Sequence, residues 1–258
     1  MTGSRHVLIL GGTGDARRLA ERLSAMPGWR VTLSLAGRTK APLAQAGALR
    51  IGGFGGAEGL ADYLRAAGME LVIDATHPFA ARISANAVRA AEMAGLPLLV
   101  LDRPGWVRRE GDRWIEVGSM GEAAAAALGE APRRVFLAIG RQEVGAFRVA
   151  PQHRYLVRSV EPVAAENALA QAQYILSRGP FAEADEMALL REHGIEVVVA
   201  KNSGGDATYG KIAAARALGL PVVMVARPPA GGGMKLESPE AVLSLLDHAR
   251  GIPALRGE

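Results

Sequence analysis

The start of the chain contains residues whose types and spacing could hold a phosphate group. An apolar run over residues 6–10 leads into Gly11-Gly12-Thr13-Gly14, and residues 15–26 carry apolar side chains at helical spacing. A strand, a glycine turn and a helix in this order let a diphosphate approach the backbone closely, and the free amides at the helix start stabilise its charge. Because the turn departs from the G-x-G-x-x-G pattern, an ordinary tight turn is the alternative.

A second candidate contact follows the strand predicted over residues 29–35. NAD-binding folds usually place an acidic residue after this strand, where it binds the ribose 2′-hydroxyl. This chain has Ser34-Leu35-Ala36-Gly37-Arg38-Thr39 there and no acid. Arg38 could pair with the 2′-phosphate of NADP, with Ser34 and Thr39 as hydroxyl donors, which favours NADPH over NADH. A solvated surface arginine is the alternative.

Two weak candidates for a catalytic side chain follow later strands. His77 lies in Asp74-Ala75-Thr76-His77-Pro78-Phe79-Ala80, after an expected strand over residues 71–75 and at the edge where open α/β sheets bind ligands. It could donate a proton or position a nicotinamide, although a histidine before a proline is often structural. Lys201 opens Lys201-Asn202-Ser203-Gly204-Gly205, which could bind an anion or only cap a helix.

Two more cationic side chains are expected at strand ends in the second half of the chain. Arg141 lies in Gly140-Arg141-Gln142 and Arg178 in Ser177-Arg178-Gly179, and either could face a cleft. The sequence has no H-E-x-x-H pair, P-loop or G-x-S-x-G turn, its five histidines are dispersed, and it has no cysteine. A metal site, thiolate catalysis and disulfides are therefore not expected.

These candidates require a scaffold of strands and helices. Near-continuous apolar runs alternate with helical stretches, which predicts an α/β protein of two Rossmann-like lobes with parallel sheets flanked by helices. We expect an N-terminal NADP-binding lobe over residues 1–102, a connecting segment over 103–117 with a small extended stretch, and a C-terminal α/β lobe over 118–258. The last helix, over residues 239–249, could pack on either lobe.

The composition narrows the class of protein. Of the 258 residues, 49% are hydrophobic and 22% are charged, which suits a globular chain with a full core. The sequence shows neither a membrane-spanning apolar run nor a signal-peptide pattern, so we expect a cytoplasmic protein without a membrane partner. A net charge of +4 favours anionic ligands, but scattered arginines and few aromatic residues argue against nucleic acid.

Several sequence blocks in a given order indicate a protein family more specifically than one glycine turn does. They are Ile9-Leu10-Gly11-Gly12-Thr13 with Ala16-Arg17, Asp74 to Ala80, Arg103-Pro104 with Trp106, Gly140-Arg141-Gln142, and Lys201 to Gly205 with Thr208-Tyr209 and Lys211. On these blocks the chain resembles, over nearly its whole length, the precorrin-6A reductase and cobalt-precorrin-6A reductase family of corrin (vitamin B12) biosynthesis. The resemblance implies NADPH-dependent reduction of one macrocycle double bond, precorrin-6A to precorrin-6B or the cobalt form, in an active-site cleft between the lobes.

Together, the motifs and the resemblance assign residues to two ligands. The cofactor NADPH is expected at Gly11, Gly12, Thr13, Asp15, Ala16, Arg17, Ser34, Leu35, Ala36, Gly37, Arg38, Thr39, Thr76, His77, Pro78 and Phe79. The substrate is expected at Arg141, Gln142, Arg178, Lys201, Asn202, Ser203 and Gly204. A tetrapyrrole-derived substrate with many carboxylates is a polyanion, which cationic side chains would orient by charge-assisted hydrogen bonds. Neighbouring enzymes of the corrin pathway are further partner candidates.

Two other functions stay open at this point. A different NADP-linked oxidoreductase, acting on another anionic substrate, would have the same opening motif. A non-catalytic protein that senses NADP would bind the cofactor and transfer no hydride. Incubation with NADPH and precorrin-6A distinguishes both from the reductase.

Overall fold

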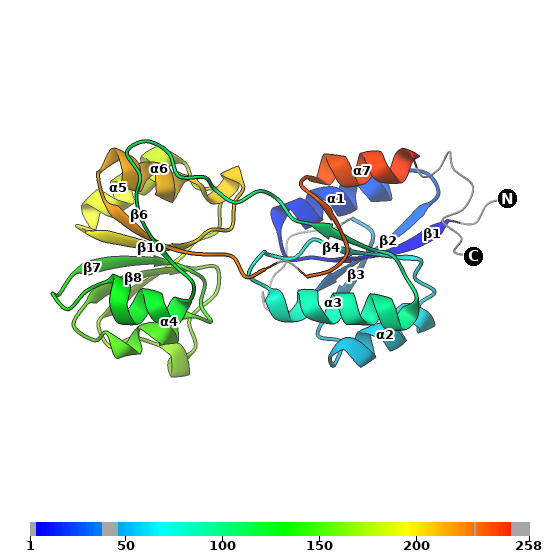
Figure 1. Cartoon of the computed structure of the whole chain (residues 1–258), viewed down its shortest axis with the longest axis horizontal. Coiled ribbons are helices and arrows are strands. Elements are labelled where there is room, and N and C mark those ends of the chain that lie inside the picture. The colour runs from blue at the N-terminus through cyan, green and yellow to red at the C-terminus, as the bar shows by residue number, and fades with distance from the viewer. Residues whose placement is uncertain (1–3, 38–45, 230, 249–258) are drawn as a thin grey trace. The chain divides into compact units, whose positions relative to one another are not determined.

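The computed structural model describes residues 4–37, 46–229 and 231–248, and these form two compact units (Figure 1). The first unit contains the described residues up to Arg103 together with those from Pro228 onward, and the second contains Pro104–Arg227. Each unit has a six-stranded sheet, and the sheets of both units are parallel throughout, as the sequence predicts. Among the described helices, none is long and apolar enough to cross a membrane.

The sheet of the first unit has the order β3-β2-β1-β4-β5-β12. Its strands are β1 (Arg5–Leu10), β2 (Trp29–Leu35), β3 (Ala48–Ile51), β4 (Leu71–Asp74), β5 (Leu98–Leu101) and β12 (Met234–Leu236). This is the strand order of dinucleotide-binding Rossmann folds, with β12 in the sixth position. The apolar run of β1 is buried because β1 lies in the middle of the sheet and is covered on both faces.

Helices cover both faces of this first sheet (Figure 1). They are α1 (Gly14–Ser24) and α7 (Pro239–His248) on one face, and α2 (Ala57–Ala66) and α3 (Ala81–Ala94) on the other. Val7 and Ile9 pack with buried residues of α1 and α7, whereas Leu8 and Leu10 pack with α2 and α3. Alternate side chains of β1 thus enter apolar cores on opposite faces of the sheet. Packing in both cores fixes the position of β1 and of the turn that leads to α1.

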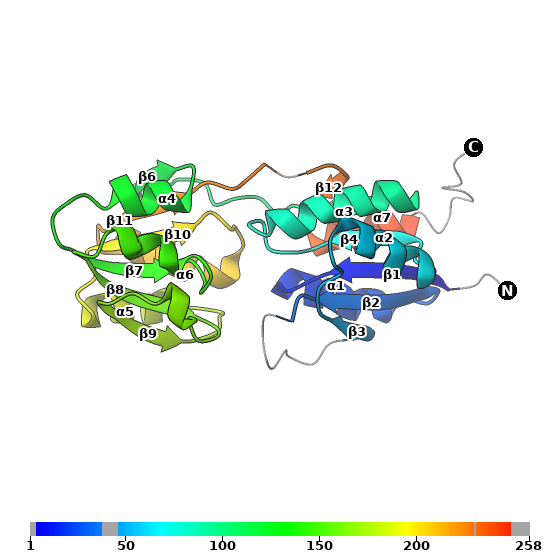
Figure 2. The same cartoon turned by 90° about the horizontal axis from the view of Figure 1, so that it is seen from below.

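The second unit repeats this plan with the order β9-β8-β7-β10-β11-β6. Its strands are β6 (Arg113–Val117), β7 (Arg134–Ala138), β8 (Arg154–Ser159), β9 (Ala172–Leu176), β10 (Val197–Lys201) and β11 (Pro221–Val225). Its α-helices are α4 (Met120–Glu122), α5 (Glu183–Glu192) and α6 (Gly210–Ala217), with a π-helical turn over Ala123–Ala127 and 3₁₀ turns over Val144–Val149, Ala165–Asn167 and Asp206–Thr208. Figure 2 shows β6 at the edge of this sheet beside β11.

The division of the chain differs from the expected boundaries in two places. The extended stretch expected inside the connecting segment is β6, a full strand of the second sheet. Residues from Pro228 onward, expected in the C-terminal lobe, belong to the first unit, where β12 pairs with β5. The physical reason is apolar burial, because Val242 and Leu246 of α7 fill the core beside α1.

Two buried histidines make the stability of the protein sensitive to acid. The ring of His6, at the start of β1, contacts the Thr32 hydroxyl (2.9 Å) and the Ala67 carbonyl (3.0 Å). The Nδ1 atom of His153 accepts the backbone N–H of Arg133 (3.2 Å), a bond that protonation of Nδ1 would break. Burial lowers the pKa of both histidines below the usual value.

We therefore expect stability to fall on acidification. Since the folded pKa values are lowered, the unfolded chain binds more protons below about pH 6.5, and stability is complete above this pH and decreases below it. For each histidine the loss is at most about 1.4 kcal/mol per pH unit, and melting temperatures measured between pH 7.5 and 5 follow it. His153→Gln should flatten this profile, whereas His248→Gln, at an exposed position, should not. A wild-type profile that is flat over this range would contradict the prediction.

Candidate functional site

The glycine turn after β1 has the local geometry that a bound diphosphate needs. A Cβ at Gly11 would lie 2.7 Å from the Leu33 side chain, so glycine permits close packing against β2. Gly12 has φ +114° and no atom within 4 Å of the position of a Cβ, which leaves open space at the start of α1. Thr13 caps α1, because its Oγ1 accepts the Ala16 N–H (3.0 Å). This arrangement would fit a diphosphate at a helix N-terminus.

The strand register brings the predicted cofactor residues of the first unit to one edge. Leu10, at the end of β1, is in register with Ser34 of β2 and with Asp74 of β4. The residues at or after the ends of these strands therefore lie at the carboxyl edge of the sheet, as predicted for a ligand site. They are residues 11–17, 34–37 and 76–79. The Thr13 hydroxyl also joins two of these segments, because it donates to the Ala75 carbonyl (2.8 Å).

The individual residues of this edge differ in what they can offer a ligand. Asp15 accepts hydrogen bonds from Arg18 (2.5 Å) and Arg103 (2.6 Å), so its negative charge in the first turn of α1 is compensated. Ala16 is buried in the core, and Arg17 is half-buried. Ser34 is only 5% exposed, which leaves little of its hydroxyl for a cofactor.

The rest of the segment after β2 is described only in part. Leu35 is half-buried, and its carbonyl accepts the Gly52 N–H (2.9 Å). Ala36 and Gly37 are exposed, and Gly37 has φ +72°. Arg38 and Thr39, predicted to recognise the 2′-phosphate, lie outside the described residues.

The segment between β4 and α3 is a tightly held turn. The Asp74 carboxylate accepts the backbone N–H (3.0 Å) and the hydroxyl (2.7 Å) of Thr76. His77 is exposed, and its Nδ1 accepts the Phe79 N–H (3.2 Å), which places the proton of the neutral ring on Nε2. Pro78 and Phe79 are half-buried, and the rings of His77 and Phe79 lie 5.8 Å apart. The turn thus presents an imidazole N–H at a fixed place beside the glycine turn.

The predicted substrate residues of the second unit also follow the carboxyl ends of its strands. Ala138 of β7 is in register with Ala200 of β10, so residues 140–142 and 201–204 share one edge, to which Arg178, after β9, also belongs. Arg178 and Gln142 are exposed, and the half-buried Arg141 donates to the Pro162 carbonyl (3.4 Å). Lys201 forms an ion pair with Glu143, a residue that the sequence pattern did not single out. Its only signal was its position directly after Gly140-Arg141-Gln142.

The loop over residues 201–205 is fixed by a segment nearly a hundred residues away. The side-chain amide of Asn202 accepts the Trp106 N–H (2.7 Å) and donates to the Trp106 carbonyl (3.0 Å). The Trp106 indole N–H donates to the Gly205 carbonyl (2.9 Å), and the Arg227 Nε donates to the Asn202 carbonyl (2.6 Å). Asn202, predicted to contact substrate, thus uses its amide to hold the loop, while Ser203 is buried.

Three charged side chains are buried beneath this loop. Arg158 forms two hydrogen bonds to the Glu186 carboxylate, one of 2.8 Å, and its guanidinium lies over the Phe181 ring. Lys211 donates to the Thr208 carbonyl (2.5 Å), and its ammonium lies 4.6 Å from the centre of the Trp106 ring. The pKa of Lys211 is lowered to about 7, chiefly by burial and to a smaller extent by the Arg158 charge, whereas the Glu186 charge raises it.

The fold and these two edges define a class of protein: an α/β protein of two Rossmann-like units, the first with a glycine turn suited to a dinucleotide and the second with cations at its strand ends. Within the described ranges, no three histidine or carboxylate side chains lie together in a way that could hold a metal ion. A family model described as Precorrin-6x reductase CbiJ/CobK matches residues 6–247. The chain belongs to this family, which confirms the resemblance inferred from its sequence blocks.

Individual relatives agree with the family model. The precorrin-6A reductase of Sinorhizobium sp is 58% identical over 221 residues, which cover 86% of this chain and 84% of the relative. The precorrin-6A reductase of Rhodococcus erythropolis is 50% identical, and the match covers 86% of this chain and 89% of the relative. The cobalt-precorrin-6A reductase of Methanothermobacter thermautotrophicus is 33% identical, and the match covers 94% of this chain and 82% of the relative. A solved structure of CobK precorrin-6A reductase, 46% identical, superposes with a TM-score of 0.90 and covers 98% of this chain and 100% of that one.

Proposed function

We propose that this chain catalyses the NADPH-dependent reduction of one double bond of precorrin-6A, which gives precorrin-6B. The observation that carries the proposal is the 58% identity with a precorrin-6A reductase over most of both chains. The lower identity of 33% with a cobalt-precorrin-6A reductase supports the metal-free substrate. The proposal includes a cytoplasmic location and, as partners, the tetrapyrrole-derived substrate and neighbouring enzymes of the corrin pathway.

The candidate residues divide the work between binding and orientation. NADPH, when bound, supplies the hydride that reduces the double bond. The turn at Gly11 and Gly12 and the amides at the start of α1 hold the diphosphate, and the turn at Thr76 to Phe79 orients the nicotinamide end. Arg141, Arg178 and Lys201 bind substrate carboxylates. His77 and Lys201 are the candidates for protonating the reduced ring.

The test of this function is spectroscopic. With NADPH and precorrin-6A present, the nicotinamide absorbance should fall and the macrocycle spectrum should shift, while NADPH without macrocycle should be unchanged. Binding of NADP without any spectral change would refute the reductase and favour a sensing protein. Oxidation of NADPH by a different anionic substrate, with precorrin-6A left intact, would favour another NADP-linked oxidoreductase.

The choice of NADPH over NADH is tested at Arg38, which the sequence alone places near the 2′-phosphate. Arg38→Ala should weaken NADPH binding by about 1 to 3 kcal/mol, roughly 5- to 150-fold, and should barely alter NADH binding, because only NADPH has the phosphate. Fluorescence titration of both cofactors measures this. Arg22→Ala removes an exposed α1 charge that pairs with Glu240 and is the matched control. Equal loss for both cofactors would rule out the phosphate role.

A further inference from the structure

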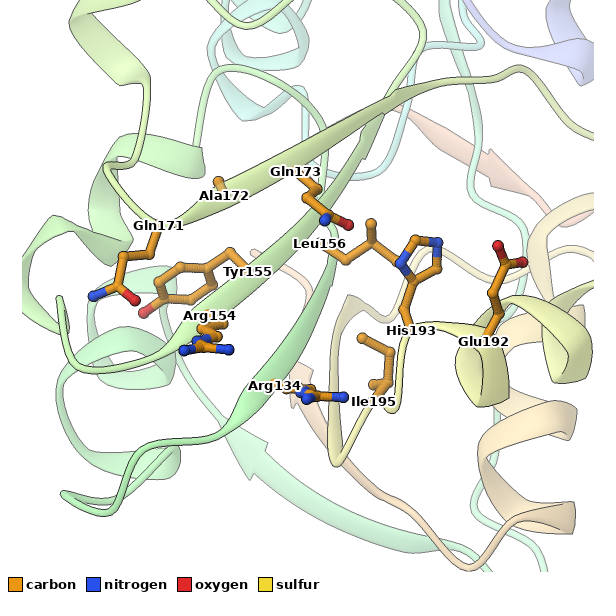
Figure 3. A pocket seen from close by; sticks show the side chains of 10 residues that line it. All are labelled: Arg134, Arg154, Tyr155, Leu156, Gln171, Ala172, Gln173, Glu192, His193 and Ile195. Carbon is orange, nitrogen blue, oxygen red and sulfur yellow. The ribbon is translucent and has the colours of Figure 1, made fainter.

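A cavity with charged walls lies in the second unit, at the opposite edge of the sheet from the candidate substrate residues. Its volume is about 570 Å³, within the range of small-molecule sites. Figure 3 shows its lining, which includes Arg134, Arg154, Gln171, Gln173, Glu192 and His193. Arg134 and Arg154 are the first residues of β7 and β8, so the pocket is at the amino ends of these strands. It is therefore separate from residues 140–142 and 201–204, which follow the carboxyl ends of β7 and β10.

The two arginines of this pocket start from neighbouring strands, on one face of the sheet. Arg134 and Arg154 are in direct register on neighbouring parallel strands, so both side chains lie on the same face of the sheet. Both side chains are exposed, and because they start from paired residues on one face, their like charges repel each other across solvent. Among the ion pairs of the residues that the structure describes, none involves either guanidinium.

The nearby acidic side chains do not neutralise the pair. Glu192 lines the pocket, but Figure 3 shows its carboxylate pointing away from both guanidinium groups. The Glu196 carboxylate accepts the backbone N–H of Arg134 (2.8 Å). Two like charges are thus held in one pocket whose other polar groups, the amides of Gln171 and Gln173 and the ring of His193, can donate hydrogen bonds.

The Arg134 guanidinium lies against the turn that follows α5. Gly194 follows α5 with φ +57°, and a Cβ at this position would lie 2.4 Å from the Arg134 Nη1 atom. This atom is the end of a flexible side chain and could shift at little cost, so the positive φ is the reason that glycine is favoured here. A purely structural reading is that Arg134 stabilises the carbonyl end of α5, where a cation is favourable. This reading does not explain why a second arginine is placed directly beside the first.

We propose that this pocket binds a small anion with two neighbouring acidic groups, which Arg134 and Arg154 bridge. The chemical class is a di- or polycarboxylate or a diphosphate, since both present paired anionic oxygens to guanidinium groups. The amide and imidazole donors bind the remaining oxygens. The site is independent of the proposed reductase activity, and its occupation cancels the repulsion within the arginine pair.

Calorimetric titration of the full chain with inorganic pyrophosphate and, separately, with citrate at constant ionic strength tests the proposal and distinguishes phosphates from carboxylates. Other cationic edges of the protein can also hold these anions. The comparison of two variants with the wild type therefore decides whether this pocket is the binding site. Arg154→Gln should weaken binding of at least one probe by about tenfold or more. Arg191→Gln removes an exposed charge from α5 outside the pocket and should leave the affinity unchanged. Equal affinities in wild type and Arg154→Gln, or equal losses in both variants, would overturn the proposal.

Thermal melting provides a second, independent readout. Without added anion, Arg154→Gln should melt at or above the wild-type temperature, because the variant removes a repulsion. The better probe should raise the melting temperature of the wild type more than that of Arg154→Gln, because only the intact pair binds it tightly. A variant that melts lower without anion, and gains as much as wild type from it, would show that Arg154 is purely structural.

Discussion

Gly204→Ala is expected to reduce the rate of precorrin-6A reduction by about 100-fold or more while NADPH affinity stays unchanged, since a displacement of about 1 Å in a positioning element has this cost. A Cβ at position 204 would lie 2.0 Å from the Pro104 carbonyl oxygen and 2.5 Å from the Arg227 Nη2 atom, and φ there is +63°. The loop must therefore move away from both, which breaks the hydrogen bonds between Asn202 and Trp106. Lys201 and its neighbours, which we propose bind substrate carboxylates, would then be displaced.

Steady-state kcat and KM with precorrin-6A, together with the Kd for NADPH, measure this effect. Gly219→Ala is the matched control, because Gly219 has a similar φ of +65° but no atom within 4 Å of a Cβ. It introduces the same backbone strain without the clash and should retain most of the activity. Wild-type kinetics in Gly204→Ala would mean that the loop is not part of the substrate site. Equal losses in both variants would point to strain alone.

Glu186→Gln should lower the free energy of unfolding of the second unit by about 3–5 kcal/mol, the usual cost of leaving a buried charge without its partner. The side chains of Arg158 and Glu186 are 8% and 3% exposed, so solvent cannot replace the lost carboxylate. The buried ammonium of Lys211 would lose the same nearby negative charge. Arg158 would remain beneath the loop without a counter-ion, and the pKa of Lys211 would fall further.

Urea unfolding followed by tryptophan fluorescence measures this loss, because Trp106 and Trp114 report on the second unit and Trp29 on the first. Glu183→Gln, at an exposed position of the same helix, is the control and should change the free energy of unfolding by less than about 0.5 kcal/mol. The double variant Arg158→Met/Glu186→Leu should be more stable than Glu186→Gln, because it removes the pair together. A loss below about 1 kcal/mol in Glu186→Gln would show that the pair is effectively hydrated.

The sequence predicted those parts of the fold whose signal is local. The strand over residues 29–35 has the predicted bounds, and the glycine turn lies between β1 and α1 as expected, because apolar runs and a glycine cluster are visible within a short window. The strands β3 and β12 were not predicted. They have only four and three residues, are largely exposed, and owe their conformation to pairing with β2 and β5.

The candidate site shows the same limit. Residues at strand ends could be named because parallel strands bring their carboxyl ends to one edge. The partners of these residues could not be named, since the hydrogen bonds between Trp106 and Asn202 join residues 96 positions apart. The pair Arg158 and Glu186 gave no signal either, because charged side chains usually predict a solvated surface. Such contacts depend on the packing of β8 against α5, which no local pattern specifies.

The position of β12 in the first sheet has a consequence for the order in which the protein is completed during synthesis. Synthesis proceeds from the N-terminus, and all residues of the second unit, Pro104–Arg227, leave the ribosome before β12 and α7 do. Until then the nascent first sheet ends at an open β5 edge, and its core lacks Val242 and Leu246. The first unit is thus the last to be completed, and a ribosome that stalls before residue 234 carries a first unit that lacks β12 and α7.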